Sequence, residues 1–238
     1  PDWSPDTFLS LMYTCHLGVY RTALVRRIGG FREGFEGSQD YDLVLRLTEH
    51  TERICHIPQV LYHWRSIPAS SAANFQTKGY AQDAGLRAIR EAVQRRGEAA
   101  FVEPVAGMCG RYRVKYSLQD RPKVSIIIPT RDLSALLETC LKSIFEKTAY
   151  HHFEVIVVDN DSREPETLDL FRRWKEKEPS RFQVAPLHIP FNFPALINEG
   201  VRNASGELVL LLNNDIEVIH ADWLDEMAAE VRATVEPG

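Results

Sequence analysis

The sequence predicts an α/β fold, an αβα sandwich around a mostly parallel sheet, and three short apolar runs carry this prediction. The runs are Val124–Arg131, Phe153–Asp159 and Glu207–Asp215, and each ends abruptly in polar residues. A strand of a parallel sheet is apolar throughout because helices cover both of its faces. Ligands of such sheets bind just beyond the carboxyl ends of the strands. The polar ends of the three runs are therefore expected to meet in one crevice.

The second half of the chain alternates strands with helices, which is the pattern of a parallel sheet. Pro194 suits a first helical turn, and the residues up to Gly206 suit a helix end. The helix after the first strand has an apolar face made of Leu136, Leu137, Cys140, Leu141 and Ile144. We expect strands at 124–128, 153–158, 182–187 and 207–212, and helices at about 136–144, 165–177, 194–203 and 221–234.

The first half of the chain has a different pattern, and a joint separates it from the second. Ser38 is a natural N-cap for a helix that follows a glycine-rich loop. We expect a strand at 13–20, a helix at 21–28, a loop at 31–37, a helix at 39–50 and β-like runs at 53–57 and 60–65. The joint, 66–121, begins as a loop and holds a helix at 78–96 and two pairing strands at 100–103 and 111–116. The predicted segments are thus 1–65, 66–121 and 122–238.

The composition narrows the class of protein. The chain has 238 residues, 44% of them hydrophobic, which is enough for a normal core. Its formal charge of −5 argues against non-specific binding of nucleic acid, which depends on clustered positive charge. No apolar stretch reaches the roughly 18 residues that span a bilayer. The four scattered cysteines form no zinc pattern. They predict reduced thiols and hence a cytoplasmic location. A longer parent protein could be attached to the membrane surface.

Asp215 and Asn213 end the most hydrophobic of the apolar runs. A carboxylate at such a strand end can hold a divalent cation against a diphosphate. Asn213 could add a carbonyl ligand or act through water. The alternative is that Asp215 caps a helix that starts nearby.

Asp159 ends a second run, where it could accept hydrogen bonds from a nucleobase or a ribose. The alternative is a turn and N-cap, because Asp, Asn and Ser all favour turns. Pro129, Thr130 and Arg131 end the first run and would line the same crevice. The chain has no glycine pattern of a dinucleotide-binding loop or a P-loop.

Asp40 follows the glycine-rich loop at the start of a predicted helix. A carboxylate there could be a general base, which must lie within hydrogen-bond reach of a hydroxyl nucleophile. The alternative is an acidic residue that only stabilises the helix dipole. His63, in an aromatic segment, could be a metal ligand or a diphosphate contact. A packed core side chain is the alternative for His63.

These motifs resemble the two halves of a family-2 glycosyltransferase of the GT-A fold, which is Rossmann-like. The nucleotide-sugar half is resembled by Val124–Arg131, Val157–Ser162, Asn192–Gly200 and Leu211–Asp215. The acceptor half is resembled by Gly29–Leu43 and His56–Arg65. Together these segments span most of the chain apart from the joint.

The resemblance implies a role for each candidate residue. Asp159 and Thr130 would contact the nucleotide, and Asp40 would be the general base. Asp215 would be the metal-binding acid of an Asp-x-Asp signature whose first acid is Asn213 here, and His63 would lie near the metal or the diphosphate. The implied cofactor is Mn²⁺ or Mg²⁺. The implied reaction transfers a sugar, with inversion, from a nucleotide-sugar, expected to be a UDP-sugar, to a saccharide acceptor in bacterial surface polysaccharide synthesis.

The order of the halves departs from the family, because the acceptor half comes first. This permuted order resembles the junction of a tandem enzyme cut within both domains. A half sheet with a bare edge would aggregate. We therefore expect the halves to complete each other, within one chain or between chains of a swapped homo-oligomer. The alternatives to an active enzyme are an inactive nucleotide-sugar-binding fragment and a structural module between domains.

Overall fold

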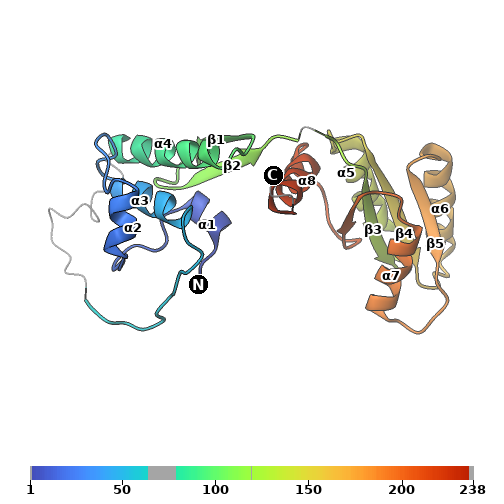
Figure 1. The fold of residues 1–238 in the computed structure, drawn as a ribbon. Coiled ribbons are helices and arrows are strands. Elements are labelled where there is room, and N and C mark those ends of the chain that lie inside the picture. The colour runs from blue at the N-terminus through green and yellow to red at the C-terminus, as the bar shows by residue number, and fades with distance from the viewer. Residues whose placement is uncertain (1, 64–78, 119, 236–238) are drawn as a thin grey trace. The chain divides into compact units, whose positions relative to one another are not determined.

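The computed structural model describes residues 2–63, 79–118 and 120–235. They form two compact units, Pro1–Ser117 and Leu118–Gly238. Figure 1 shows both units. The predicted loop at 66–73 lies outside the described residues.

The second unit contains a four-stranded sheet in which all strands are parallel. Its strands are β3 (Val124–Thr130), β4 (Phe153–Asp159), β5 (Phe182–Pro186) and β6 (Leu208–Leu211). They lie in the order β5-β4-β3-β6. The chain therefore adds β4 and β5 on one side of β3 and then crosses back to place β6 on the other side of β3. The predicted α/β fold with a parallel sheet is confirmed.

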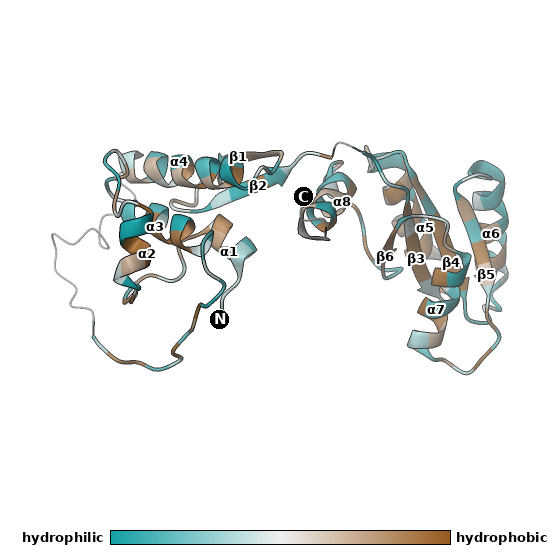
Figure 2. Cartoon of the chain, viewed as in Figure 1, coloured by the Kyte–Doolittle hydropathy of each residue, from teal (hydrophilic) through white to brown (hydrophobic). Residues whose placement is uncertain are grey.

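Helices cover both faces of this sheet, as an αβα sandwich requires. They are α5 (Ser134–Lys147), α6 (Pro165–Lys177), α7 (Phe193–Asn203) and α8 (Trp223–Val235). Ile126 and Ile128 pack with residues of α5, α6 and α8, whereas Ile127 packs with Leu196 of α7. Figure 2 shows how hydrophobic these strands are. The alternation of side chains between two covered faces explains why β3 is apolar along its length.

The prediction that Leu136 belongs to the buried face of α5 is wrong. Leu136 is 46% exposed, whereas Leu137, Cys140, Leu141 and Ile144 are fully buried. Residues three and four apart share a helix face. The buried face of α5 thus begins at Leu137 and excludes its neighbour.

A polar cluster ties the amino-terminal ends of the sheet strands together around Glu154 of β4. Glu154 accepts hydrogen bonds from Ser125 Oγ at 2.6 Å and from Ser205 N at 2.8 Å, and Lys123 Nζ lies 2.8 Å from its other oxygen. Burial would raise the pKa of Glu154, but these contacts outweigh burial and lower it to about 2. The cluster fixes the turn that leads into β6.

The described residues of the first unit form helices and one hairpin. Its elements are α1 (Pro5–Ser10), α2 (Thr22–Arg27), α3 (Gln39–Thr48), α4 (Gly79–Arg95), β1 (Ala100–Pro104) and β2 (Tyr112–Tyr116). The two strands pair antiparallel, as predicted. Ala88, Ile89 and Ala92 of α4 share one core with Val44 and Leu45 of α3. The described part of the predicted joint, up to residue 117, is therefore built into this unit.

Three predicted strands of the first unit are not found. Segments 13–20, 53–57 and 60–63 have no regular structure, and 64–65 lie outside the described residues. Val19 and Val60 are 95% and 90% exposed. A strand needs a hydrogen-bonded neighbour, and in the described part of this unit only β1 and β2 pair. The helix α1 was not predicted.

The helices of the described residues contain no segment that is both long and apolar enough to cross a membrane.

Candidate functional site

The polar strand ends of the second unit meet where the strand order reverses. Thr130 of β3 and Asp159 of β4 are partners in register, so these two strand ends lie side by side. Across the reversal point between β3 and β6, Asn214 Nδ2 donates to Thr130 Oγ1 at 2.9 Å. Ligands of open α/β sheets bind outside the carboxyl ends of the strands at this point. The structure thus brings Thr130 next to Asp159 and to Asn214. The meeting of these residues with Arg131, Asn213 and Asp215 in one crevice stays a prediction.

Thr130 and Asp159 are both buried. Asp159 Oδ1 accepts a hydrogen bond from the backbone N–H of Ser162 at 3.0 Å, which is the predicted turn. Its backbone oxygen accepts from Leu187 N at 2.8 Å. The carboxylate of Asp159 is thereby held at the rim by its Oδ1.

Asn160, which the sequence did not single out, fastens the ends of three strands. Its backbone N–H donates to Thr130 O at 2.9 Å. Its side-chain amide donates to Leu187 O at 3.2 Å and to Ile189 O at 2.8 Å. Within the described residues its buried amide oxygen has no hydrogen-bond partner. The rim therefore retains one buried acceptor between the ends of β4 and β5.

The end of β3 and the loop after it carry the other predicted residues. Pro129 is half-buried and Arg131 is exposed. Next to them, Asp132 Oδ1 accepts from the backbone N–H groups of Arg163 and Glu164 at 2.7 and 2.9 Å. These two bonds, from Glu164 and then Arg163, lower the pKa of Asp132. The loops after β3 and β4 are thus joined, which gives the rim a fixed outline.

Asn213 and Asp215 are both exposed beyond the end of β6. The helix α8 begins only at Trp223, so Asp215 caps no helix start and the capping alternative is wrong. Beneath this loop lies Cys140 of α5, whose Sγ is 3.8 Å from Asn213 O. Burial, and then the charge of Asp215, raise the pKa of Cys140 to about 12. The carboxylate of Asp215 is therefore close to the buried face of α5 at Cys140, and it is exposed to solvent.

A divalent cation suits the oxygen donors of this loop. The Asp215 carboxylate and the Asn213 amide are hard donors of the kind that Mn²⁺ and Mg²⁺ take. Among the described residues no group of three or more His, Cys, Asp or Glu could hold a metal ion. A metal ion held by one protein carboxylate and by the oxygens of a bound diphosphate needs no such group, so this arrangement is compatible with that finding. His63, the other predicted metal ligand, is exposed and belongs to the first unit. Of the two predicted metal ligands, the second unit therefore contains only Asp215.

In the first unit, Asp40 lies in the first turn of α3 and is half-buried. Its Oδ1 accepts from the backbone N–H of Tyr41 at 2.8 Å. Burial, and then the charge of Asp40, raise the pKa of Tyr20. Ser38 occupies the predicted N-cap position, but its hydroxyl does not cap the helix. Asp40 thus sits on a helix, directly after the glycine-rich loop, with a carboxylate that solvent can reach.

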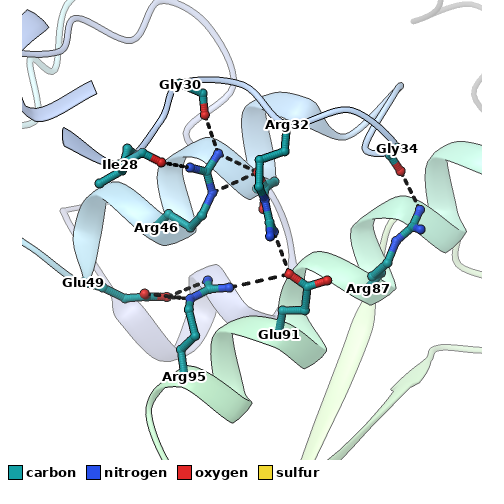
Figure 3. A network of polar contacts seen from close by, with 10 residues as sticks. Ile28, Gly30, Arg32, Gly34, Arg46, Glu49, Arg87, Glu91 and Arg95 are labelled. Carbon is teal, nitrogen blue, oxygen red and sulfur yellow. Dashed lines mark hydrogen bonds and ion pairs between the residues drawn. The ribbon is translucent and has the colours of Figure 1, made fainter. Parts of the chain in front are cut away.

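Asp42, two residues further on, has a different role that the sequence did not reveal. It is fully buried and accepts from Arg46 Nε and Nη2 at 3.0 and 2.7 Å and also from Arg32. Burial would raise its pKa, but these two arginines outweigh burial and lower it. Arg46 also donates to Ile28 O at 2.8 Å and to Gly30 O at 2.6 Å (Figure 3). The spacing of Asp42 and Arg46, four residues apart on a helix, was the available signal.

Comparison with known proteins assigns the family of the second unit. Residues 125–235 match the model of glycosyl transferase family 2. This segment belongs to that family. The match includes the strand ends and the loops described above. The acceptor-side assignment of the first unit stays a prediction.

Two curated relatives match almost the whole chain. One is "O-antigen biosynthesis protein RfbC" of Myxococcus xanthus, 44% identical over 98% of this chain. The other is "Uncharacterized protein y4gI" of Sinorhizobium fredii, 45% identical over 96% of this chain. The chain spans only 18% and 25% of the lengths of these relatives. The succession of the two units is therefore shared with longer proteins.

A solved structure is similar to half of the chain. It is "Mannosyltransferase PcManGT from Pyrobaculum calidifontis in complex with GDP-Man and Mn2+", which is 29% identical with a TM-score of 0.44. The match covers 50% of this chain and 34% of the mannosyltransferase.

Proposed function

We propose that this chain takes part in sugar transfer from a nucleotide-sugar donor to a saccharide acceptor during assembly of a bacterial surface polysaccharide. Membership of residues 125–235 in glycosyl transferase family 2 supports the type of reaction. The relative named for O-antigen biosynthesis supports the type of product. Inversion at the anomeric carbon is part of the proposal and rests on the resemblance to family-2 enzymes.

The observation that carries the proposal is the polar rim at the reversal point of the sheet. Thr130 and Asn214 bridge this point, and Asp159 lies in register beside Thr130. The rim therefore offers carboxylate and hydroxyl groups to a base or ribose on one side. On the other side it offers Asp215 and Asn213 to a diphosphate. We propose that Pro129 and Arg131 complete this donor site.

A divalent cation, Mn²⁺ or Mg²⁺, fits the proposed donor site next to Asp215. When bound, such an ion stabilises the negative charge of the departing nucleoside diphosphate. Asp215 would hold the ion, and the neighbouring Asn213 would orient its water or phosphate ligands. His63 is proposed as a further contact to the diphosphate, contributed by an acceptor half.

Asp40 is proposed as the general base that accepts the proton of the acceptor hydroxyl. Its carboxylate is half-buried, and among the described residues its one hydrogen bond comes from a backbone N–H to Oδ1, so that its other oxygen could meet a substrate. General base catalysis typically supplies about 10²–10⁴-fold in rate. The adjacent Asp42 cannot take this role because both of its oxygens are bound by arginines.

Calorimetric titration tests the donor site. UDP and UDP-glucose are titrated into the chain with and without Mn²⁺. We expect binding that requires Mn²⁺ and is lost in Asp215→Ala. Glu217→Ala is the matched control, because Glu217 is an exposed carboxylate of the same loop that pairs with Lys147. Equal binding by Asp215→Ala and the unchanged chain would refute the metal assignment.

A second candidate function is binding of a nucleotide-sugar without transfer. The amide of Asn213, at the place of the first acid of the family signature, favours this alternative. Measuring sugar transfer or donor hydrolysis in Asp40→Asn separates the two. Loss of turnover by at least about 10²-fold with donor binding retained supports catalysis by Asp40. Normal turnover in this variant would remove Asp40 from the mechanism.

A further inference from the structure

The loop that leads to Asp40 has a backbone that needs outside support. We define the glycine loop as residues 29–38. Four of its residues, Gly29, Gly30, Gly34 and Gly37, have φ between 67° and 85°. Glycine adopts this left-handed conformation without strain, but it is also the most permissive residue in other conformations. Contacts from outside must therefore select the single shape that the loop takes.

Arginines of two helices hold the carbonyl groups of the glycine loop. Arg46 of α3 binds Gly30 O, and Arg87 of α4 donates to Gly34 O at 2.5 Å. The guanidinium groups of Arg32 and Arg87 lie 4.2 and 4.9 Å from the ring centre of Phe35, which is buried in the loop. Figure 3 shows Arg87 reaching the loop from α4. The middle of the loop is thus attached to α4 in two ways through Arg87. Arg87 donates a hydrogen bond to Gly34 O, and its guanidinium group lies over the ring of Phe35.

Glu91 of α4 makes the second attachment. Its Oε2 lies 2.7 Å from Arg32 Nη2, and Arg32 in turn binds the buried Asp42 of α3. An exposed ion pair contributes little to stability. This one is half-exposed, so its main effect is on where Arg32 points. Arg32 of the loop is thereby held between the carboxylate of Asp42 on α3 and that of Glu91 on α4.

The end of the glycine loop rests on the first turn of α4. Ser38 Oγ donates to Ala81 O at 2.7 Å, in a buried contact. A Cβ atom on Gly37 would lie 2.7 Å from the Cβ of Ala81, so the two backbones approach as closely as glycine allows. Asp40 follows Ser38 by two positions. The contact of α4 with the loop thus continues up to the turn that presents Asp40.

We propose that α4 is a positioning element for Asp40, and that Arg87 and Glu91 are positioning residues for the sugar-transfer reaction. This inference rests on the proposed role of Asp40 as general base. A base must be held close to its productive place, since a shift of about 1 Å can cost up to roughly 10²-fold in rate. The helix α4 thus serves the chemistry as well as the core of the first unit.

Hydrogen exchange of the backbone amides tests the positioning without any assay of catalysis. We compare the unchanged chain with the double variant Arg87→Ala/Glu91→Ala and with Glu91→Gln. The matched control is Glu49→Ala, which breaks the pair of Glu49 with Arg95 on the same α3–α4 contact and keeps the bonds of Arg87 and Glu91 to the loop, with Arg95 still 3.8 Å from Glu91. We expect exchange in peptides covering 29–38 to accelerate at least about 10-fold in the double variant, less in Glu91→Gln, and not in the control. Unchanged exchange in the double variant would overturn the proposal.

Turnover provides the second measurement. In the same variants we expect kcat of sugar transfer to fall roughly 10–100-fold with KM for the donor unchanged, and no fall in Glu49→Ala. A fall of the same size in the control would show a merely structural role and overturn the proposal. A chain that transfers no sugar would count against the proposed function alone, because the exchange result still reports whether α4 holds the loop.

Discussion

The two units place their important carboxylates by different means. In the second unit, main-chain pairing of parallel strands sets Asp159 beside Thr130, and the rim follows from the sheet. In the first unit, side chains fasten a permissive loop, through Arg46 and Arg87 to its carbonyl groups. A rim built on a sheet depends on few individual side chains. A loop built on arginines depends on each of them, and this difference makes the units separable by mutation.

The largest effect is expected from breaking the buried pair of the first unit. Asp42→Ala leaves Arg46, which is buried, without its carboxylate. Removing one partner of a buried pair costs about 3–5 kcal/mol. We expect the free energy of unfolding of the first unit to fall by this amount. Urea denaturation measures the loss, and hydrogen exchange of peptides from each unit shows which unit has lost stability. The second unit should keep its stability.

Asp40→Ala is the matched control for this stability measurement. It removes a carboxylate from the same helical turn, but one that is half-buried and that, within the described part of the chain, is hydrogen-bonded only to a neighbouring N–H. Its cost should stay below about 1 kcal/mol. Equal destabilisation by the two substitutions would show that the buried network has no special part in holding the loop.

A smaller effect is expected from the polar cluster of the second unit. The pKa of Glu154 is about 2 in the folded chain, against 4.5 normally. A lowered pKa contributes stability above pH 4.5, and this contribution is lost as pH falls toward 2. Glu154→Gln should therefore destabilise the second unit by about 2–3 kcal/mol at pH 7, with the difference from the unchanged chain shrinking as pH approaches 2.

Denaturation at pH 7, 4 and 2.5 measures this difference. The matched variant is Glu207→Gln, since Glu207 is an exposed residue at the same end of the sheet whose pair with Arg232 lies on the surface. It should change stability by less than about 1 kcal/mol at every pH. A gap between Glu154→Gln and the unchanged chain that does not narrow in acid would contradict the role given to Glu154.

Much of the second unit could be predicted from its sequence. The helix α6 has the predicted bounds, and β3 and β4 run only one or two residues further than expected. Two-sided burial gives these strands their continuous apolar character, which is a local signal. The positions of Thr130 and Asp159 at neighbouring strand ends followed from the same pattern.

The remaining features depend on partners that are distant in sequence. Of three consecutive polar residues, Asn214 and not Asn213 or Asp215 reaches Thr130, and only the folded loop decides which side chain turns inward. The segments at 13–20 and 53–57 have the composition of strands, but composition supplies no neighbour to pair with. The attachment of the glycine loop to α4 joins residues more than forty positions apart, such as Ser38 and Ala81.

The most direct test of the central claim is a crystal structure of this chain grown with UDP and Mn²⁺. We predict the nucleotide at the reversal point of the sheet, with its base beside Asp159 and Thr130 and its diphosphate and the metal ion beside Asp215. A nucleotide bound elsewhere on the chain, with this rim unchanged, would contradict the account.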